Sequence, residues 1–393
     1  MKLNYLLIFI PIAILLDWIG WNPLIVFITS ALAIIPLASL MGTATEVLAR
    51  YLGPTFGGLL NATLGNAPEI IISILALHKG LYDVVKASIT GSIIGNLLFG
   101  LGVAMIFGGL KHGIQKFDRV HAGMSAGLMQ LAAVGLLIPA LFEHLTTGEQ
   151  ENISIETAVV LLIVYILSIV FMIRRAKKLK AMSIPEPLSP VIAAATASDT
   201  STVPADPSRP GNGSVGPDDA QNEIIDEREA LQRNAETEST PSWSRNQAIG
   251  LLTLITVGLA VVSETLTGAI EPASELLGLT PIFSGVILLA MVGNAAELYN
   301  AVRFARANQM DLTFGICAGA GSQVALLVAP VLVFVSLAMG DPLNLVFSPF
   351  EVAAVAFAVL INARITSDGE CHWMEGVLLV GVWILVAIGF FNL

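Results

Sequence analysis

A five-residue motif occurs twice in this chain, each time inside a long apolar segment. The first copy, GNAPE at 65–69, lies within the segment 57–77, and the second, GNAAE at 293–297, lies within 284–302. In each copy an asparagine and a glutamate are three residues apart, so their side chains share one face of a helix. A carboxylate at membrane depth costs about 2.5–3.5 kcal/mol on insertion scales, which makes it a functional candidate. Two copies in similar settings predict an internal repeat with an ion site between its halves.

The composition indicates a polytopic membrane protein. The 393 residues are 55% hydrophobic and 12% charged, whereas soluble domains carry about 25% charged residues. We expect an all-α fold with about eleven transmembrane helices of roughly 20 residues each. The first apolar segment lacks a small-residue cleavage site, so we interpret it as a retained span and not as a signal peptide. The predicted spans are 4–20, 24–49, 57–78, 83–108, 121–142, 156–174, 246–270, 281–306, 311–339, 348–363 and 373–391.

The distribution of Lys and Arg predicts the orientation. With the N-terminus in the cytoplasm, the predicted inside loops hold fourteen of these residues, and the outside loops hold only Lys79 and Lys86. This asymmetry follows the positive-inside rule through all eleven spans, with the long loop at 181–244 left out of the count. The two cysteines, Cys317 and Cys371, are far apart in the sequence and predict no disulfide framework.

The segment 181–244 divides the chain. It carries 11 acidic residues against three arginines and is rich in Pro, Ser and Thr, a composition that cannot bury a core and predicts disorder. Within it, residues 218–236 combine helix formers with acidic residues, so a regulatory, cation-sensing helix is weighed against a solvated linker. The predicted organisation is an N-terminal helix (1–23), a five-helix repeat (24–180), this cytoplasmic loop and a second five-helix repeat (245–393). Five spans bring the chain to the opposite side of the membrane, so the second repeat begins on the other side from the first. The two repeats are therefore inverted relative to each other.

The two glutamates of the repeated motif, Glu69 and Glu297, are predicted ligands of a hard divalent cation. Calcium binds about six to eight oxygens from carboxylates, amides, backbone carbonyls and water, and two carboxylates match its charge. The glycines of both copies predict helix breaks that free backbone carbonyls. No Cys or His is near in the sequence, which disfavours a soft or zinc-like site. The other predicted calcium ligands are Asn66, Asn294, Ser92, Asn96, Gln323 and Ser322, with Gly65 and Gly293 as candidates for backbone carbonyls.

The same carboxylates suggest how protons exchange for the cation. Desolvation favours the neutral carboxyl and a bound cation favours the carboxylate, so proton and cation compete for one site. Glu46 and Glu264, which precede the two motif copies, are interpreted either as a proton relay or accessory cation site, or as anchors of the span ends. Glu351, near the end of another span, is weighed in the same way between a structural and an accessory role.

Six stretches of the sequence carry a resemblance to a known family. They are ATE (44–46), GGLLNATLGNAPE (57–69), GSIIGNLLFGLG (91–102), VSE (262–264), GNAAE (293–297) and QVALLVAP (323–330). With these residues the chain resembles the calcium/proton exchanger family of the calcium/cation antiporter superfamily. The resemblance implies eleven spans, with spans 2–6 and 7–11 as inverted repeats. It also implies calcium ligation by Glu69 and Glu297 with help from the nearby asparagines, and alternating access by movement of spans 2 and 7 against the rest.

The chain departs from the family pattern at two positions. Leu298 follows the second glutamate where the family usually has His, and Ala320 stands where relatives usually have a serine. The departure at Leu298 bears on proton sensing, and that at Ala320 bears on selectivity among divalent cations such as calcium and manganese.

The sequence therefore predicts a secondary antiporter, not an enzyme, that removes calcium from the cytoplasm in exchange for protons. The alternatives are a sodium-coupled exchanger, an exchanger of broad divalent specificity and a cation channel. We expect calcium and protons as transported ions, no cofactor and no nucleic acid partner. The surrounding partner is the lipid bilayer of a prokaryotic plasma membrane or an organelle such as the vacuole, and assembly into a homo-oligomer is left open.

Overall fold

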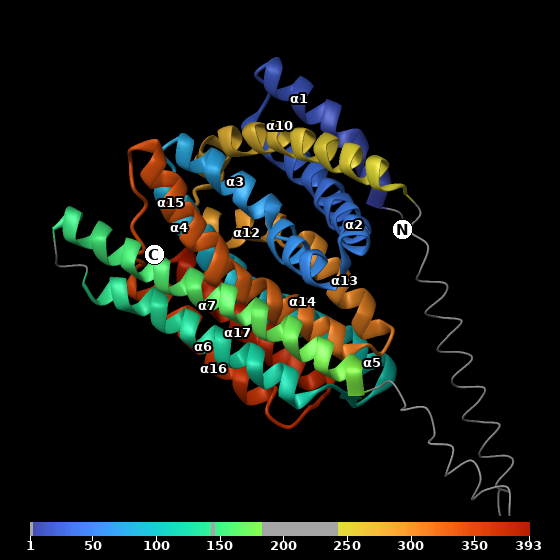
Figure 1. Ribbon diagram of the computed structural model, residues 1–393. Coiled ribbons are helices and arrows are strands. Elements are labelled where there is room, and N and C mark those ends of the chain that lie inside the picture. Colours follow the sequence, from blue (N-terminus) through green and yellow to red (C-terminus); the bar gives the residue numbers. More distant parts are fainter. Residues whose placement is uncertain (1–2, 143–145, 183–242) are drawn as a thin grey trace, which may run out of the picture. The chain divides into compact units, whose positions relative to one another are not determined.

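The computed structural model describes residues 3–142, 146–182 and 243–393 (Figure 1). The predicted acidic helix at 218–236 lies outside these residues. Residues 1–169 and 246–393 form one compact unit, which carries everything discussed below, and residues 170–245 form a second one.

Helices account for nearly all of the described chain. The first half contains η1 (Leu3–Ile8), α1 (Phe9–Trp18), α2 (Pro23–Leu64), α3 (Ala67–His78), α4 (Tyr82–Ile94), η2 (Gly95–Gly100), α5 (Leu101–His112), α6 (Arg119–Leu141) and α7 (Thr147–Met182). The second half contains α10 (Arg245–Leu277), α11 (Pro281–Phe283), η3 (Ser284–Leu289), α12 (Ala290–Gly293), α13 (Ala295–Arg306), α14 (Met310–Gln323), η4 (Val324–Val328), α15 (Ala329–Met339), α16 (Pro349–Ile365) and α17 (Trp373–Phe391). The segments η2, η3 and η4 are π-helical.

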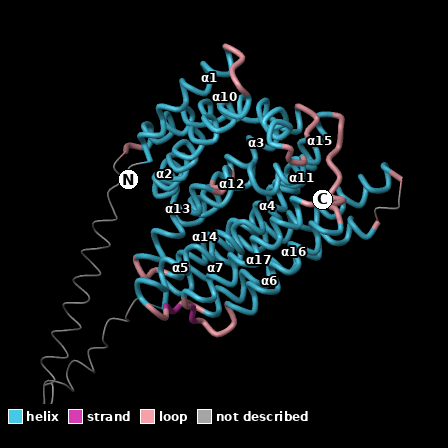
Figure 2. Tube along the Cα trace, turned by 180° about the vertical axis from the view of Figure 1, so that it is seen from behind, coloured by secondary structure: helices cyan, strands magenta, loops and turns pink. Residues whose placement is uncertain are grey.

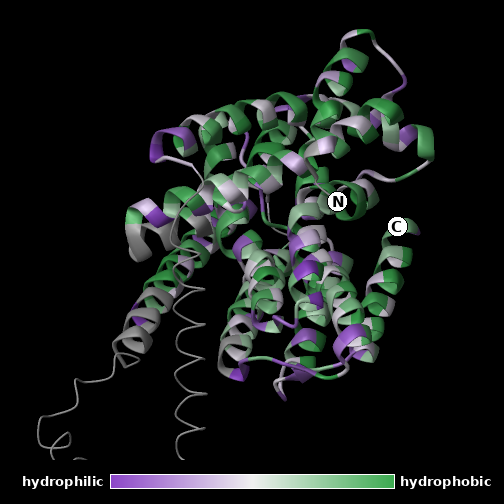
Figure 3. Cartoon of the chain, turned by 90° about the vertical axis from the view of Figure 1, so that its right-hand side faces the viewer, coloured by the Kyte–Doolittle hydropathy of each residue, from purple (hydrophilic) through white to green (hydrophobic). Residues whose placement is uncertain are grey.

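The helices confirm an all-α polytopic membrane protein. In the described chain, seven helices are long and apolar enough to cross a membrane, or eight if the bent pair of Pro281–Gly293 and α13 is one span. Each of the eleven predicted spans overlaps a helical segment, but α1, α3 and α16 have fewer than 18 residues. The number of eleven spans therefore stays a prediction. The outer faces of the helices are largely apolar (Figure 3), with Leu254 and Leu385 each 68% exposed, as suits a surface in contact with lipid.

Some predicted boundaries were wrong. A loop was expected between residues 49 and 57, but α2 continues through Gly53 and Pro54 as one helix of 42 residues. A proline removes only one N–H donor, and a continuous helix satisfies the other backbone groups next to lipid. The helix α7 likewise begins at Thr147, before the expected start at 156. One short antiparallel ladder pairs β1 (Gln115–Lys116) with β2 (Glu370–Cys371) and joins two interhelical connections at one end of the unit (Figure 2).

Equivalent helices of the two halves pack in equivalent ways. The helix that begins with the second motif copy, α13, packs on α5, and α3, which begins with the first copy, packs on α15. Both pairs join an element of one half to an element of the other half. This exchange is what two repeats related by a twofold axis produce, and it brings both motif copies to the middle of the unit (Figure 1).

The helices at the centre approach so closely that their backbones touch. A Cβ added at Gly91 in α4 would lie 2.1 Å from the Val286 carbonyl oxygen, and one added at Gly285 in η3 would lie 2.5 Å from the Val84 carbonyl oxygen. Small residues permit such crossings in membranes, where packing replaces the hydrophobic effect as the force between helices. The α4–η3 crossing therefore requires glycine on both sides.

We predict that Gly91→Ala destabilises the protein by about 1–3 kcal/mol, because the new methyl group overpacks a backbone contact that cannot yield. Thermal unfolding in detergent measures the effect. The control is Gly42→Ala in α2, where an added Cβ meets nothing within 4 Å. This variant should be as stable as the wild type or more stable, because alanine has a higher helix propensity than glycine. Equal melting temperatures for the two variants would contradict this account of the crossing.

Candidate cation site

Both copies of the repeated motif lie where a helix is interrupted. The helix α2 ends at Leu64 and α3 begins at Ala67, with Asn66 at its N-cap. In the second copy α12 ends at Gly293 and Asn294 is the N-cap of α13, and the helical segment Pro281–Gly293 is bent by 57° relative to α13. The glycines thus interrupt both helices, as predicted, and each glutamate falls in the first turn of the new helix. The positive end of the helix dipole favours a carboxylate there.

The two carboxylates lie near each other without hydrogen-bond partners for all their oxygens. Glu69 is 8% exposed, and the Oε2 atoms of Glu69 and Glu297 are both buried with no partner in the described chain. A Cβ added at Gly293 would lie 3.4 Å from Glu69 Oε1, and Glu297 is close enough for the two charges to interact. Buried acceptors that no protein group satisfies require a proton, an ion or water.

The three predicted asparagines offer carbonyl oxygens to the same region. Asn66 donates through Nδ2 to Gln323 Oε1, Asn96 donates to the Ser92 carbonyl oxygen at 3.1 Å, and Asn294 donates to that same carbonyl oxygen at 3.4 Å. All three are buried. Because each uses its NH₂ group as the donor, each side-chain carbonyl oxygen remains available to a cation.

The structure brings most of the predicted ligands together across the two halves. The amide pair of Asn66 and Gln323 joins α14 to the N-terminus of α3, and the pair of Asn294 and Ser92 joins the N-terminus of α13 to α4. For Ser92 the contacts involve the backbone carbonyl, although the sequence suggested the side chain. The Ser322 hydroxyl donates to the Gly319 carbonyl oxygen at 2.8 Å within its own helix, so this hydrogen bond does not connect it to another predicted ligand.

Two π-helices adjoin these ligands. The segment η2 contains Asn96, and η4 begins directly after Gln323. A π-helix widens the turn, and such turns occur frequently at functional sites. Asn362 on α16 was not among the predicted ligands. It is 4% exposed and donates to the Leu97 carbonyl oxygen in η2 at 3.5 Å. Only the packing of α16 against η2 could reveal this residue.

In the triplets ATE (44–46) and VSE (262–264), the hydroxyl residue faces the interior and the glutamate does not. The glutamates are exposed, and each makes an ion pair: Glu46 with Arg50 at 2.8 Å and Glu264 with Lys79 at 2.9 Å. The hydroxyl residues Thr45 and Ser263 are instead 0% exposed, and neither hydroxyl has a partner among the described residues. No described contact joins Glu46 or Glu264 to the central carboxylates.

The structure adds information on two further residues, Glu351 and Cys317, whose surroundings the sequence did not predict. Glu351 is buried and fully bonded, since it accepts from Thr90 at 3.2 Å and forms a capping box with Ser348 at the start of α16. Cys317, remote from both motif copies in the sequence, is buried close enough to Glu297 for their charges to interact. Both cysteines are free, as expected. Among the described residues, no three or more His, Cys, Asp or Glu side chains are grouped so that they could hold a metal ion. The candidate donors are mainly carboxylate and amide oxygens, which suit a hard cation.

Comparison with known proteins adds independent evidence. A family model described as "Sodium/calcium exchanger protein" matches residues 22–174 and 247–392. The chain is 41% identical to a "Ca(2+)/H(+) antiporter" of Synechocystis over 390 residues, which cover 98% of this chain and 96% of that protein. It is 33% identical to the "Ca(2+)/H(+) antiporter ChaA" of Bacillus subtilis over 98% of this chain and 97% of that one. The solved structure of native YfkE matches with a TM-score of 0.74 and 31% identity, covering 99% of this chain and 100% of that chain.

We predict that the amide pair between Asn66 and Gln323 stabilises the contact between the two halves by about 1 kcal/mol. Asn66→Leu and Gln323→Leu should each lower the free energy of unfolding in the absence of calcium, and the double variant should lose less than the sum of both losses. The control pair is Asn66→Leu with Ser322→Ala, because the Ser322 hydroxyl bonds only within α14. Strict additivity for Asn66 and Gln323 would contradict the role of this pair.

Proposed function

Because the chain belongs to the sodium/calcium exchanger protein family, we propose that it is a calcium/proton antiporter, which is the activity named for its relatives of 41% identity. The observation that carries the proposal is the pair of carboxylates of Glu69 and Glu297, one from each half, whose Oε2 atoms are both buried and have no hydrogen-bond partner among the described residues. They would bind calcium, with the carbonyl oxygens of Asn66, Asn294 and Asn96 and the backbone carbonyls near Gly65 and Gly293 as further ligands.

The exchange follows from electrostatics. Two adjacent carboxylates repel each other when both are charged in a region of low dielectric, so either a divalent cation or protons must neutralise them. Calcium and protons then exclude each other from one site. If the site crosses the membrane only when occupied by one or the other, the transport of calcium is coupled to that of protons in the opposite direction.

The two halves would provide the movement. The helices α2 and α10, which contain predicted spans 2 and 7, would move against the remaining helices and open the site to one side at a time. The asymmetry of Lys and Arg supports a cytoplasmic N-terminus and a cytoplasmic loop at 181–244. In this orientation an inward proton gradient removes calcium from the cytoplasm, across either a plasma membrane or a vacuolar membrane.

We predict that Glu69→Gln and Glu297→Gln each reduce calcium transport by at least about ten-fold, the lower limit reported for loss of groups that support metal ligands. Calcium uptake into proteoliposomes with a low internal pH measures this. Wild-type uptake should require the pH gradient and should not change when sodium replaces potassium.

The control for this experiment is Glu370→Gln, which removes a carboxylate that pairs with Lys116 on β1 and β2, outside the spans. Its transport should equal that of the wild type. Wild-type uptake that follows a sodium gradient would refute proton coupling, and full transport by both motif variants would refute the site.

A second prediction separates the two interpretations of Glu264. Its carboxylate is 55% exposed, and Lys79 Nζ lies 2.9 Å from Oε1 and also donates to the Glu264 backbone carbonyl at 2.9 Å. An exposed ion pair contributes only about 0–1 kcal/mol. We expect Lys79→Gln and Glu264→Gln to have equally small effects on transport, with the same pH profile. A pH profile that shifts in Glu264→Gln alone would identify a proton relay instead.

A further inference from the structure

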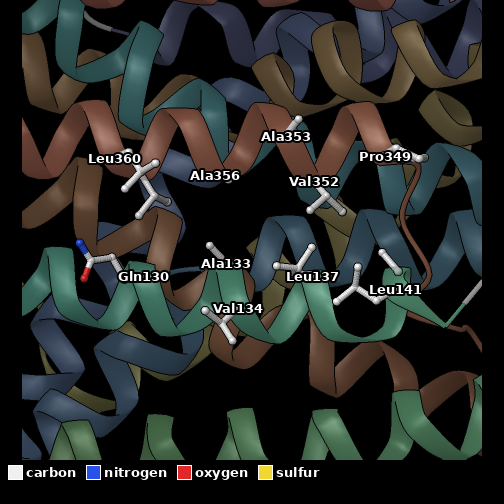
Figure 4. Close-up of a pocket in the computed structure, with 12 residues that line it drawn as sticks. Gln130, Ala133, Val134, Leu137, Leu141, Pro349, Val352, Ala353, Ala356 and Leu360 are labelled. Carbon is white, nitrogen blue, oxygen red and sulfur yellow. The ribbon is translucent and has the colours of Figure 1, made fainter.

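An apolar groove runs along the outer side of the unit between α6 and α16. It has a volume of about 550 Å³, and the two helices pass each other antiparallel on its walls (Figure 4). The wall on α6 extends from Gln130 to Leu141, and the wall on α16 extends from Pro349 to Leu360. Both helices lie within predicted spans, and Val134, Leu141 and Leu360 are 49%, 64% and 59% exposed. The groove is therefore open to the hydrocarbon of the bilayer.

The groove continues into a polar pocket toward the N-terminus of α6. This pocket, of about 610 Å³, shares Gln130 with the groove and is lined by Arg119, Gly123 and Gly127 on α6 and by Thr366 and Ser367 after α16. A Cβ added at Gly123 or Gly127 would meet nothing within 4 Å. The two glycines thus leave an open passage from Arg119 to the apolar groove. From Arg119 to Leu141 the path follows about 33 Å of helix, which approximates the thickness of the hydrocarbon core.

Two arginines lie at the polar end. The side chain of Arg119 packs against Gly369, where an added Cβ would lie 2.2 Å from its Cγ, and Arg364 donates to Ser367 Oγ at 3.1 Å. Neither forms an ion pair with any described residue. Of the nearby acidic groups, Glu370 is paired with Lys116 at 3.2 Å, and Asp368 accepts from the Glu370 backbone N–H. Asp311 accepts from the backbone N–H of Asp118, the exposed residue that precedes Arg119. In the orientation that the Lys and Arg count predicts, this end faces the cytoplasm, where the leaflet carries anionic headgroups.

We propose that this continuous groove binds one anionic phospholipid. The phosphate lies at Arg119, close to the Ser367 hydroxyl, and one acyl chain follows Gly123 and Gly127 past Gln130 into the apolar part. From Arg119 to Gln130 the path follows about 17 Å of helix, which is close to the depth of one leaflet. The cation at the headgroup end, the glycine passage and the start of the apolar groove therefore follow one another in the order of the parts of one phospholipid. A zwitterionic lipid fits the apolar part equally well but lacks the net charge that Arg119 would attract.

Native mass spectrometry of the full chain in detergent tests the proposal. The chain is titrated with phosphatidylglycerol and, separately, with phosphatidylcholine of the same acyl chains. The wild type should bind one phosphatidylglycerol about five-fold more tightly than phosphatidylcholine, the effect expected of one arginine near an anionic lipid. Arg119→Gln should remove this preference, and Lys116→Gln should retain it, because Lys116 is a neighbouring cation already paired with Glu370.

Gly127→Leu tests the passage, since a side chain there would fill the open space and should weaken the binding of both lipids. Its melting temperature and calcium transport should match those of the wild type, and if this variant does not fold, Arg119→Gln carries the test. Equal binding of the two lipids by the wild type would overturn the proposal, as would an unchanged preference in Arg119→Gln. A dimer that Gly127→Leu dissociates would also overturn it and would assign the groove to a second copy of the chain.

Discussion

Two carboxylates within the apolar helices need a partner that no described residue provides. Each buried oxygen of Glu69 and Glu297 that lacks a hydrogen bond raises the free energy of the folded chain unless a proton or a cation compensates. The surrounding structure makes this compensation reversible. It places amide oxygens nearby, and the described chain shows no Lys or Arg contact that would neutralise the carboxylates permanently. Exchange between calcium and protons depends on this deficit of positive charge.

The backbone brings the carboxylates together. Polar groups from α3, α4, α13 and α14 can meet only if these helices cross at short distance, and glycine makes this possible at Gly91, Gly285 and Gly293. The asparagines then join the halves, because their NH₂ groups donate across the repeat boundary while their carbonyl oxygens remain available. The same side chains can thus stabilise the contact between the halves and present oxygen to an ion.

The outer surface of the helices is apolar, as contact with the hydrocarbon of a bilayer requires. Leucine, valine and phenylalanine side chains cover the outer faces of the helices, and polar groups gather at the centre and at the ends. The groove between α6 and α16 differs from the rest of this surface because small residues leave space and arginines lie at one end. The proposed lipid groove thus lies on the outer side of α6 and α16, whereas the proposed ion site lies between α3, α4, α13 and α14.

The sequence alone determined the class of the fold, since long apolar segments with few charges can satisfy their backbones in a membrane only as helices. It also identified the carboxylates and asparagines, because a polar motif repeated inside two apolar segments needs a common explanation. The comparisons confirmed the family that the motif suggested, while the individual ligands and the number of spans stay predictions. Only the tertiary structure decided that Thr45 and Ser263 are buried while Glu46 and Glu264 are exposed, that α2 has no break before Gly65, and that Asn362 and Cys317 lie near the site. The physical reason is that the face of a helix that is buried, and the residues that approach it from distant parts of the chain, depend on how the helices cross, and local sequence does not specify those crossings.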